Sequence, residues 1–430
     1  MTDADSTEFH VRTAERYAEL LGRSKGALMK AGQALSFVSV IPAVPAEFQP
    51  IYRQALKRLR DDAPPMAPEL ARATLESELR RRTESVFAEF DWNPLAAASI
   101  GQVHAARLHD GRAVAVKIQY PGVAAAISAD LRNGELLSTL LGLVFGLSPK
   151  SVSFDVRGAA RELSVRIAEE LDYRQEAANQ AEFADIYRGH PFIRIPEVMG
   201  ELCTDRVLTQ ELVLGKPWSE ALACEPELRA GWAEAIYRFV YATLLRSCMF
   251  NADPHPGNYL FHEDGSVSFL DFGCVKRLHR DQVEALVAVG RACTRGDVRG
   301  TWRACVEGGF CRSTDPVSPE EVYGFWRESW QMWWGEQPFT VTPERAARWI
   351  EHKYSPTGPS ANPVRYFTAS PDYTAVGRIE VSTASLIAEL RPTNYWGSMA
   401  AEFFENSPPF TTLGKLDHAF FGGHSVPIGA

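Results

Sequence analysis

The sequence predicts an α+β fold in which short β-strands lie between long α-helices. Apolar residues recur at roughly helical spacing over residues 8–40, and the last third of the chain is also helical and aromatic. From Phe87 on, the period changes toward that of strands. Two short apolar runs, residues 259–261 and 267–270, flank a Gly-containing turn and predict a β-hairpin. Strand-rich and helix-rich parts are therefore both expected.

Length and charge limit the class of protein. A chain of 430 residues can bury a large core, in one two-lobed domain or in two closely packed ones. The 45% hydrophobic and 23% charged composition is that of an ordinary soluble protein. A net charge of −9 argues against nucleic-acid binding, because phosphate contacts need a basic face.

Cysteines and apolar runs give no sign of export or of a membrane span. The seven cysteines include no Cys-x-x-Cys pair, so neither a disulfide framework nor a zinc site is indicated. The acidic N-terminus has no signal-peptide core, and the apolar-rich run at 136–147 is too short to cross a bilayer. We expect a cytosolic protein, and we leave peripheral attachment to a membrane open.

The first helix, residues 8–40, contains Lys30-Ala31-Gly32-Gln33. A glycine inside a helix costs about 1 kcal/mol relative to alanine, which indicates close packing or a bend there. On pattern alone, Lys30 and Gln33 are surface residues beside a helix crossing. Residues 61–68 are rich in Asp and Pro and predict a linker, and residues 68–83 predict the next helix.

An alanine-rich segment and a lysine-bearing strand follow. The segment resembles the glycine-rich, nucleotide-binding loop of protein kinases, with alanines at the first two glycine positions. The resemblance implies these candidate nucleotide contacts: Ala96, Ala97, Ala98, Ser99, Gly101 and Val103. The strand at 112–117 ends in Lys117, far enough from Gly101 for a hairpin to return beneath the loop. A lysine that faces inward is costly unless it is paired, so we expect Lys117 to contact phosphates, with Ala115 nearby. The alternatives are a small-residue turn and an exposed lysine.

Two helices are predicted next, at about 123–147 and 155–189. The leucine stripe of the first predicts core or interlobe packing. The second carries Glu170, Asp172 and Glu176, of which 172 and 176 share a helical face whereas 170 lies well round the helix. Acidic residues on helices are usually solvated, so the pattern alone assigns them no role.

The apolar strand at 207–215 resembles the segment that enters the hinge of protein kinases, and the resemblance makes it a candidate for binding a base through its backbone. Main-chain groups of Glu211 and Val213 would meet the adenine edge, although any buried strand has a similar sequence. A helix at 226–249 then leads into the most informative stretch.

That stretch is residues 251–258, which are followed by Asp271-Phe272-Gly273. Phosphoryl transfer needs a carboxylate near the acceptor oxygen and oxygen ligands for magnesium. Asp253 and Asn258 lie five positions apart, which is the offset between the aspartate and the metal-binding asparagine in the kinase catalytic loop. The predicted hairpin separates them from Asp271. We expect Asp253 to orient or deprotonate the acceptor, and Asn258 and Asp271 to bind Mg²⁺.

Trp326, Trp330, Trp333 and Trp334 recur at helical spacing, and a core stripe is favoured over a lipid-facing surface. Residues 355–375 and 406–430, rich in Pro, Ser, Thr and Gly, are predicted to be irregular.

Ala-Asp-Pro-His-Pro-Gly-Asn at 252–258, together with Asp-Phe-Gly, resembles the UbiB/AarF/ADCK family of atypical protein-kinase-like proteins. The resemblance implies a two-lobed protein-kinase-like fold with an N-terminal helical extension and a mostly helical C-terminal lobe. The expected domains are 1–67 (extension), 68–215 (N-lobe) and 216–430 (C-lobe).

The resemblance also implies roles for residues that the pattern leaves open. Lys30 and Gln33 of the extension would face the active site, with Glu170 and Asp172 as their acidic counterpart. Glu176 would be the ion-pair partner of Lys117. The alanine-rich loop is itself the family's pattern, and it weakens any expectation of ordinary protein-kinase activity.

The expected function is that of a Mg-ATP-binding atypical kinase or ATPase. The resemblance points to prenyl-lipid, quinone or other small-molecule metabolism. The expected partners are ATP and a lipid or small-molecule substrate, and nucleic acid is not expected; a biosynthetic partner enzyme is left open. One alternative is a small-molecule phosphotransferase of the antibiotic- or choline-phosphorylating sort. Another is a non-catalytic, nucleotide-gated partner protein. All three expect Lys117, Asp253 and Asp271 to converge on one nucleotide.

Overall fold

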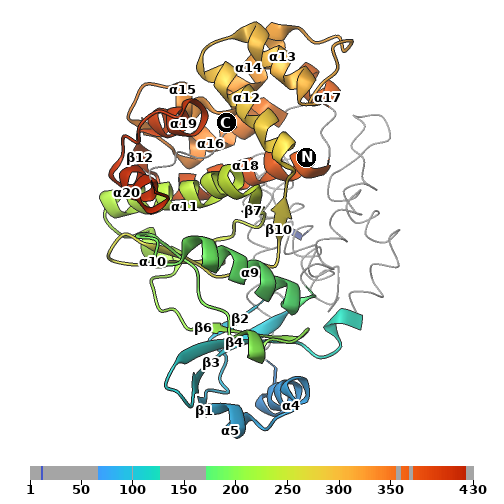
Figure 1. Cartoon of the computed structure of the whole chain (residues 1–430), viewed down its shortest axis with the longest axis vertical. Coiled ribbons are helices and arrows are strands. Elements are labelled where there is room, and N and C mark those ends of the chain that lie inside the picture. The colour runs from blue at the N-terminus through green and yellow to red at the C-terminus, as the bar shows by residue number, and fades with distance from the viewer. Residues whose placement is uncertain are drawn as a thin grey trace. The chain divides into compact units, whose positions relative to one another are not determined.

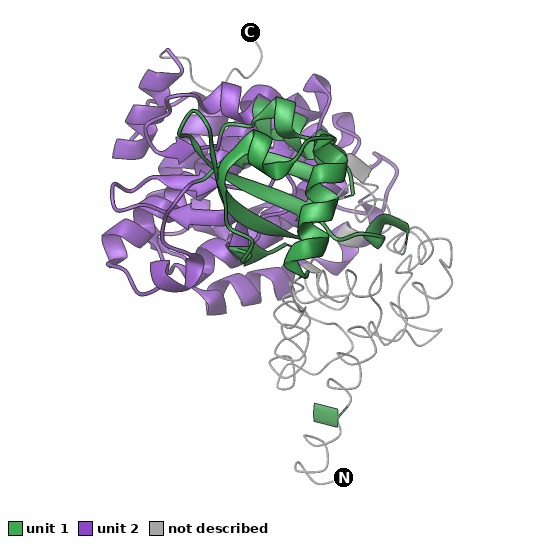
Figure 2. Ribbon diagram, turned by 90° about the horizontal axis from the view of Figure 1, so that it is seen from below, with its two compact units in different colours: residues 1–181, 197–212 green, residues 182–196, 213–430 purple. Residues whose placement is uncertain are grey.

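A computed structural model shows how these segments fold (Figure 1). It describes residues 11–12, 66–98, 100–125, 171–354, 360–367 and 371–422. Lys30, Gln33, Ser99 and Glu170 lie outside the described residues, as do most of the helices predicted at 8–40 and 123–147. The chain forms two compact units, coloured in Figure 2: unit 1 is residues 1–181 and 197–212, and unit 2 is residues 182–196 and 213–430.

Unit 1 contains an antiparallel sheet with the strand order β1-β3-β4-β6. The strands are β1 (Phe87–Phe90), β3 (Gly101–Leu108), β4 (Ala113–Gln119) and β6 (Val207–Glu211), and β2 (Ala96–Ala97) pairs with β3. One face of β4 packs in a core with residues of α4 (Pro68–Leu79) and α5 (Thr83–Val86). The strands predicted at 112–117 and 207–215 and the helix predicted at 68–83 are confirmed, although β6 ends at Glu211 and α4 at Leu79.

The helix α9 (Tyr173–Tyr187) begins in unit 1. The prediction of one helix over 155–189 is wrong at residues 171 and 172, which are not helical. Asp172 instead precedes the helix, and its Oδ1 accepts the backbone N–H of Gln175 at 3.0 Å. Aspartate is a favoured helix N-cap because it satisfies such N–H groups. Asp172 and Glu176 therefore do not share a helical face as predicted: Asp172 is exposed and Glu176 is buried.

The strands of unit 2 form small sheets. β8 (Tyr259–Phe261) and β9 (Val267–Phe269) make the predicted hairpin, and β5 (Ile193–Arg194) adds to β9 in parallel. Two pairs were not predicted: β7 (Met249–Asn251) with β10 (Val275–Arg277), and β11 (Phe339–Thr340) with β12 (Thr393–Asn394).

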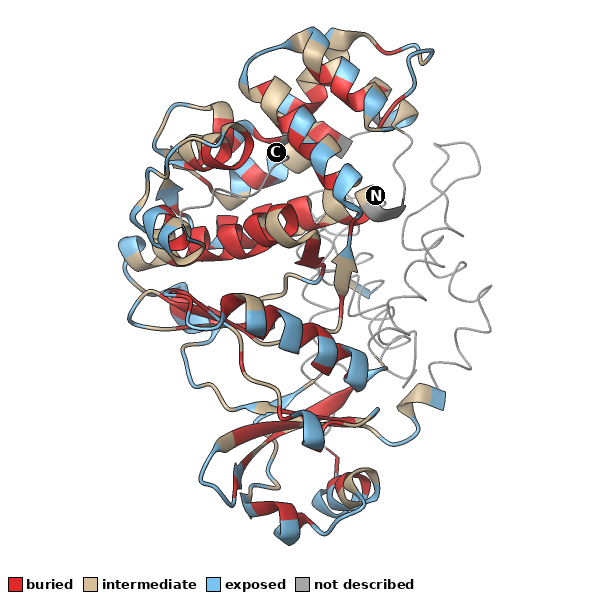
Figure 3. Ribbon diagram, in the orientation of Figure 1, coloured by how far each residue is buried: buried red, intermediate tan, exposed pale blue. Residues whose placement is uncertain are grey.

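Helices make up most of unit 2. At its centre α11 (Pro226–Ser247) is buried along most of its length, as Figure 3 shows. The helices around the hydrophobic core are α10 (Trp218–Ala221), α12 (Arg280–Thr294), α13 (Val298–Glu307), α14 (Pro319–Ser329), α15 (Gln331–Trp334), α16 (Pro343–Tyr354), α17 (Ala361–Tyr366), α18 (Pro371–Glu389), α19 (Trp396–Glu405) and α20 (Thr412–Phe420). The α+β class is therefore confirmed.

Two predictions for the last third have different outcomes. The irregular segments predicted at 355–375 and 406–430 are wrong where α17, the start of α18 and α20 lie. The core prediction for the tryptophans is confirmed, since Trp326, Trp330 and Trp333 are buried. Their helix is not continuous, however, because α14 ends at Ser329 and Trp330 leaves helical geometry.

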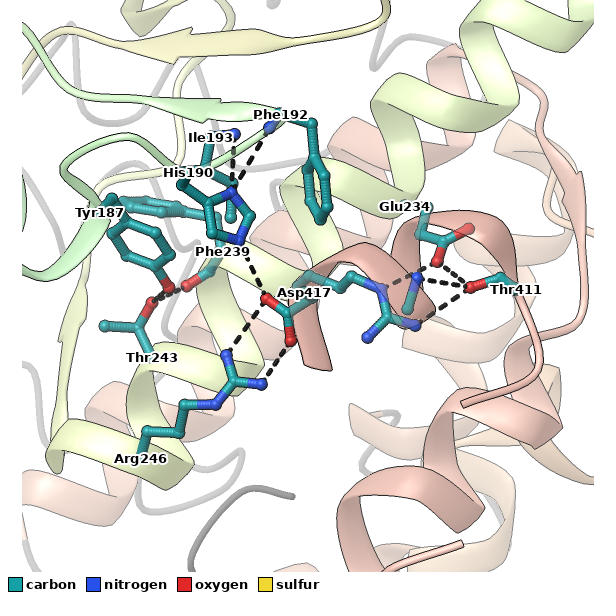
Figure 4. Close-up of polar contacts among 12 residues, drawn as sticks. Tyr187, His190, Phe192, Ile193, Glu234, Phe239, Thr243, Arg246, Thr411 and Asp417 are labelled. Carbon is teal, nitrogen blue, oxygen red and sulfur yellow. Dashed lines mark hydrogen bonds and ion pairs between the residues drawn. The ribbon is translucent and has the colours of Figure 1, made fainter. Parts of the chain in front are cut away.

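Buried charges anchor α20 to the rest of unit 2 (Figure 4). Arg238 of α11 donates to Glu234 at 2.8 Å and to Glu402 at 2.8 and 2.9 Å. Asp417 of α20 accepts from Arg246 and lies 3.2 Å from Nε2 of His190. Each of these charges has a partner, which buried ionic groups require.

Among the described residues, we find no helix that combines the length and the apolar character needed to span a bilayer.

Candidate active site

Lys117 lies on β4 and pairs with Glu176 of α9. Its Nζ is 2.8 Å and 2.9 Å from the two carboxylate oxygens of Glu176. The lysine side chain is 15% exposed and the glutamate side chain 3%. Nζ also lies 4.8 Å from the ring centroid of Tyr173, within the range of a cation–π interaction. The pair offsets the cost of holding a lysine in this largely apolar setting.

Strand register places other predicted site residues on the same face of the sheet as Lys117. Val103 of β3 is directly opposite Lys117, and Ala115 lies two residues before it on β4. Gly101 lies two residues before Val103. Because side chains alternate between the faces of a sheet, these four positions share one face. Tyr173 and Ala177 of α9 pack with Leu208, the β6 neighbour of Lys117, on that side.

The alanine-rich segment turns back on itself before β3. Ala96 pairs with Val103, and the N–H of Ala98 donates to the carbonyl oxygen of Gly101 at 2.9 Å. A Cβ at Gly101 would lie 2.3 Å from the backbone oxygen of Ile118, much too close for any side chain. Glycine is therefore required where β3 passes β4, for a steric reason that the sequence does not show.

A buried polar chain on β3 was missed by the sequence analysis. Oε1 of Gln102 accepts the N–H of Met66 at 2.8 Å, and its Nε2 lies 2.8 Å from Nε2 of His104. Nδ1 of His104 is 2.9 Å from the carbonyl oxygen of Asp91, so it donates there and Nε2 accepts. Burial lowers the pKa of His104, which favours this neutral form. The sequence does carry one indication of this polar chain, namely two polar residues two positions apart within an otherwise apolar strand.

The predicted base-binding segment continues from β6. The N–H of Glu211 donates to Glu197 at 2.8 Å, and the N–H of Leu212 donates to Ala113 at 3.0 Å. The side chain of Glu211 is exposed and that of Val213 is partly exposed. The contact of these backbone groups with adenine stays a prediction.

In unit 2, the hairpin brings Asn258 close to Asp271. Tyr259 pairs with Phe269, and just beyond that pair the N–H of Leu270 donates to the carbonyl oxygen of Asn258 at 3.0 Å. Asn258 thus lies across from Leu270, next to Asp271. The two predicted magnesium ligands therefore lie at the same end of the hairpin.

The turn that carries Asp253 is held by its own polar groups. Nδ1 of His255 accepts the N–H of Gly257 at 3.0 Å, and the N–H of Asn258 donates to the carbonyl oxygen of His255 at 2.9 Å. Nδ2 of Asn258 lies 3.5 Å from the carbonyl oxygen of Asp253. The carboxylate of Asp253 is on an exposed residue, as a group that meets a substrate needs to be.

Phe272 anchors the Asp-Phe-Gly segment in the core of unit 2. Its side chain is fully buried, with its ring centroid 4.9 Å from that of Phe183 and 6.4 Å from that of Phe239. Oδ1 of Asp271 accepts the N–H of Gly273 at 3.0 Å. These contacts fix the backbone on which Asp271 is presented.

Asn251 was not predicted as a site residue, yet it contacts both aspartates. Its Oδ1 accepts the N–H of Asp253 at 3.0 Å, and its Nδ2 donates to the carbonyl oxygen of Asp271 at 2.6 Å. The sequence could have indicated this role, because an asparagine side chain often accepts a hydrogen bond from the backbone N–H two residues later, and Asn251 lies two residues before Asp253.

The donor set fits magnesium held together with a nucleotide. Asn258 and Asp271 offer an amide oxygen and a carboxylate, and Mg²⁺ is usually bound through one or two carboxylates plus substrate phosphates and waters. No cluster of three or more His, Cys, Asp or Glu suited to a metal occurs among the residues that the structure describes. An amide oxygen and one carboxylate are a ligand set that suits Mg²⁺ bound together with phosphates.

Comparison with known proteins gives a consistent result. Residues 58–304 match the model of the ABC1 atypical kinase-like domain. The chain is 34% identical to the mitochondrial atypical kinase COQ8B of Rattus norvegicus over 286 residues, 66% of this chain and 52% of that protein. It is 35% identical over 268 residues to a chloroplastic aarF domain-containing protein kinase of Arabidopsis thaliana, covering 62% of this chain and 36% of that one. The chain thus spans between about a third and a half of these relatives' length.

A solved structure is similar over nearly the whole chain. It is that of Rv3197 from Mycobacterium tuberculosis in complex with erythromycin, with a TM-score of 0.65 and 30% identity. The match covers 93% of this chain and 97% of that one. The protein-kinase-like form of the α+β fold is shown by this likeness together with the matched domain.

Proposed function

Since this chain belongs to the ABC1 atypical kinase-like family, we propose that it binds Mg-ATP and uses it for phosphoryl transfer or ATP hydrolysis. The observation that carries the proposal is the position of Asn258 and Asp271 at one end of the β8–β9 hairpin, joined by the bond from Leu270 to Asn258. Bound Mg²⁺ would neutralise phosphate charge there. The Lys117–Glu176 pair, a lysine aligned by a buried carboxylate, supports a phosphate-binding role for Lys117.

The remaining residues would orient the reactants. Asp253, exposed on a turn held by His255 and Asn258, would orient or deprotonate the acceptor. The face of the sheet that holds Gly101, Val103 and Ala115 would contact the nucleotide, and the backbone of Glu211 and Val213 would meet adenine. Lys30, Gln33, Glu170 and Asp172 keep the role that the family resemblance implies for the N-terminal extension.

The acceptor is proposed to be a lipid or another small molecule. The short connection from Gly273 to α12 leaves little chain for docking an extended peptide. The complex of Rv3197 with erythromycin adds a macrolide to the compounds worth testing. We also propose that the protein acts in the cytosol, in peripheral contact with membranes or with a biosynthetic enzyme.

ATP turnover and nucleotide binding test the proposal. Wild type, Asp253→Asn and Asp271→Ala would be assayed with Mg-ATP alone and with a prenylated phenol, lipid vesicles or a macrolide. We expect Asp271→Ala to lose Mg-dependent binding, and Asp253→Asn to keep binding but lose turnover. Asp264→Ala, in the turn at the other end of the hairpin, is the matched control and should change neither.

Intact ATP-dependent stabilisation and turnover in Asp271→Ala would contradict the metal assignment. Binding without turnover in wild type, unchanged by Asp253→Asn, would favour a non-catalytic, nucleotide-gated protein instead.

A further inference from the structure

Asn251, the last residue of β7, joins two segments that the proposed chemistry needs to keep together. We infer that it is a positioning residue, which couples the turn of Asp253 to the backbone of Asp271. Its amide oxygen accepts from the N–H of Asp253, and its amide nitrogen donates to the carbonyl oxygen of Asp271. The roles of the two aspartates rest on the proposed function, whereas the two hydrogen bonds do not.

Backbone hydrogen bonds join these two segments as far as Cys274. β7 and β10 pair Asn251 with Val275, and one further bond runs from the N–H of Ala252 to the carbonyl oxygen of Cys274 at 2.7 Å. Asp271 lies three residues before Cys274 in the chain. The side chain of Asn251 extends the connection to Asp271.

The amide suits this position because it offers a donor and an acceptor at once. Asn251 is 8% exposed, so an unpaired group here would not be compensated by bulk water. The bond to Asp253 spans two residues and shapes the turn locally. The bond to Asp271 spans 20 residues and is the one that couples the two segments.

Two substitutions separate these bonds. Asn251→Thr keeps an oxygen that can accept the N–H of Asp253, but its side chain is too short to donate to Asp271. Asn251→Leu has a similar size and removes both bonds. If the coupling matters, the threonine variant behaves like the leucine variant; if only the local turn matters, it behaves like wild type.

Asn394 provides a matched control in the same unit. Its Nδ2 donates to the carboxylate of Glu234 at 3.0 Å and its Oδ1 accepts the N–H of Tyr395 at 2.8 Å, so it also uses both its amide donor and its amide acceptor, at a site with no proposed chemistry. Asn394→Leu therefore shows how much the loss of an asparagine side chain with two hydrogen bonds changes the same measurements at a site away from the aspartates.

The first measurement is the Mg²⁺ concentration that gives half-maximal binding of a fluorescent ATP analogue. We expect it to rise about three- to tenfold in both Asn251 variants, the range that one net hydrogen bond supplies, and to stay unchanged in Asn394→Leu. A threonine variant with the Mg²⁺ dependence of wild type would overturn the coupling.

The second measurement does not depend on the proposed function. Without nucleotide, amide hydrogen exchange in a peptide covering residues 271–274 should be faster in both Asn251 variants than in wild type and Asn394→Leu. Unchanged exchange would overturn the inference even if Mg-ATP binds. If wild type binds no Mg-nucleotide but exchange rises as expected, the proposed function fails and the coupling stands.

Discussion

Lys117 and Glu176 form a bidentate ion pair although 59 residues separate them in the chain. The carboxylate is nearly buried, so glutamine in its place would leave the ammonium without an opposite charge. We expect Glu176→Gln to weaken Mg-ATP binding at least about tenfold, about 1.4 kcal/mol, as measured by titration calorimetry. Glu182→Gln, on the same helix, is the control because its pair with Arg277 is exposed. Equal affinity in the two variants would argue against a role for the buried pair.

Gly101→Ala should destabilise the sheet of unit 1. The new Cβ would meet the backbone oxygen of Ile118 at 2.3 Å, so β3 and β4 would have to separate. Overpacking of this kind costs about 1–3 kcal/mol, and thermal unfolding would show it as a lower Tm. Gly231→Ala, within α11 with open space around its Cβ position, should leave Tm unchanged or higher. A Gly101→Ala protein as stable as wild type would mean that the strands can move apart freely.

Acid should destabilise the protein through His190. Nδ1 of His190 accepts the N–H of Ile193 at 3.1 Å and Nε2 faces Asp417, so the folded form holds a neutral ring. Burial lowers the pKa of His190 below its ordinary value of 6.5. As the pH falls below about 6.5, His190 becomes protonated in the unfolded chain while it stays neutral in the folded chain. Stability therefore falls as pH falls, by at most about 1.4 kcal/mol per pH unit from this group.

The measurement is the difference in Tm between pH 7.5 and pH 5.5, in wild type and in His190→Gln. Glutamine also offers a donor and an acceptor but does not titrate, so the difference should shrink. Asp417 has a pKa lowered to about 2, with hydrogen bonds from His190 and Arg246 overcoming its burial, so it does not titrate in this window. An unchanged difference would assign the acid sensitivity to other groups.

Arg238→Met should be strongly destabilising. It would leave Glu234 and Glu402 buried without their cation, a change that typically costs about 3–5 kcal/mol. Arg295→Met removes an exposed partner of Glu405 and should cost no more than about 1 kcal/mol. Urea unfolding of both variants checks the contrast, and similar midpoints would show that the buried network relaxes.

Elements were predicted correctly from the sequence where the local pattern of apolar residues is itself what makes the element form. The β8–β9 hairpin follows from two apolar runs around a turn, and α11 follows from a long apolar helical segment. Among the expected site residues, Gly101, Val103, Ala115 and Lys117 share one face of a sheet, and Asn258 and Asp271 lie at one end of a hairpin. The convergence of Lys117, Asp253 and Asp271 stays a prediction.

Tertiary contacts explain what the sequence did not predict. Residues 406–430 look irregular by composition, yet α20 forms because Thr411 caps it and Asp417 is held by Arg246 and His190. The break before α9 depends on whether Asp172 caps a helix or lies within one, which periodicity cannot decide. Asn251 was missed because its importance lies in a bond to a residue 20 positions away.

The path of the chain through the two units affects how they can be taken apart. Residues 182–196 belong to unit 2, but the chain then returns to unit 1 for residues 197–212. A fragment cut after β6 would carry β5 without β9, its parallel partner. No single cleavage therefore releases either half whole. Exchanging one half for that of a relative would therefore require replacing two separate segments of the chain at three junctions.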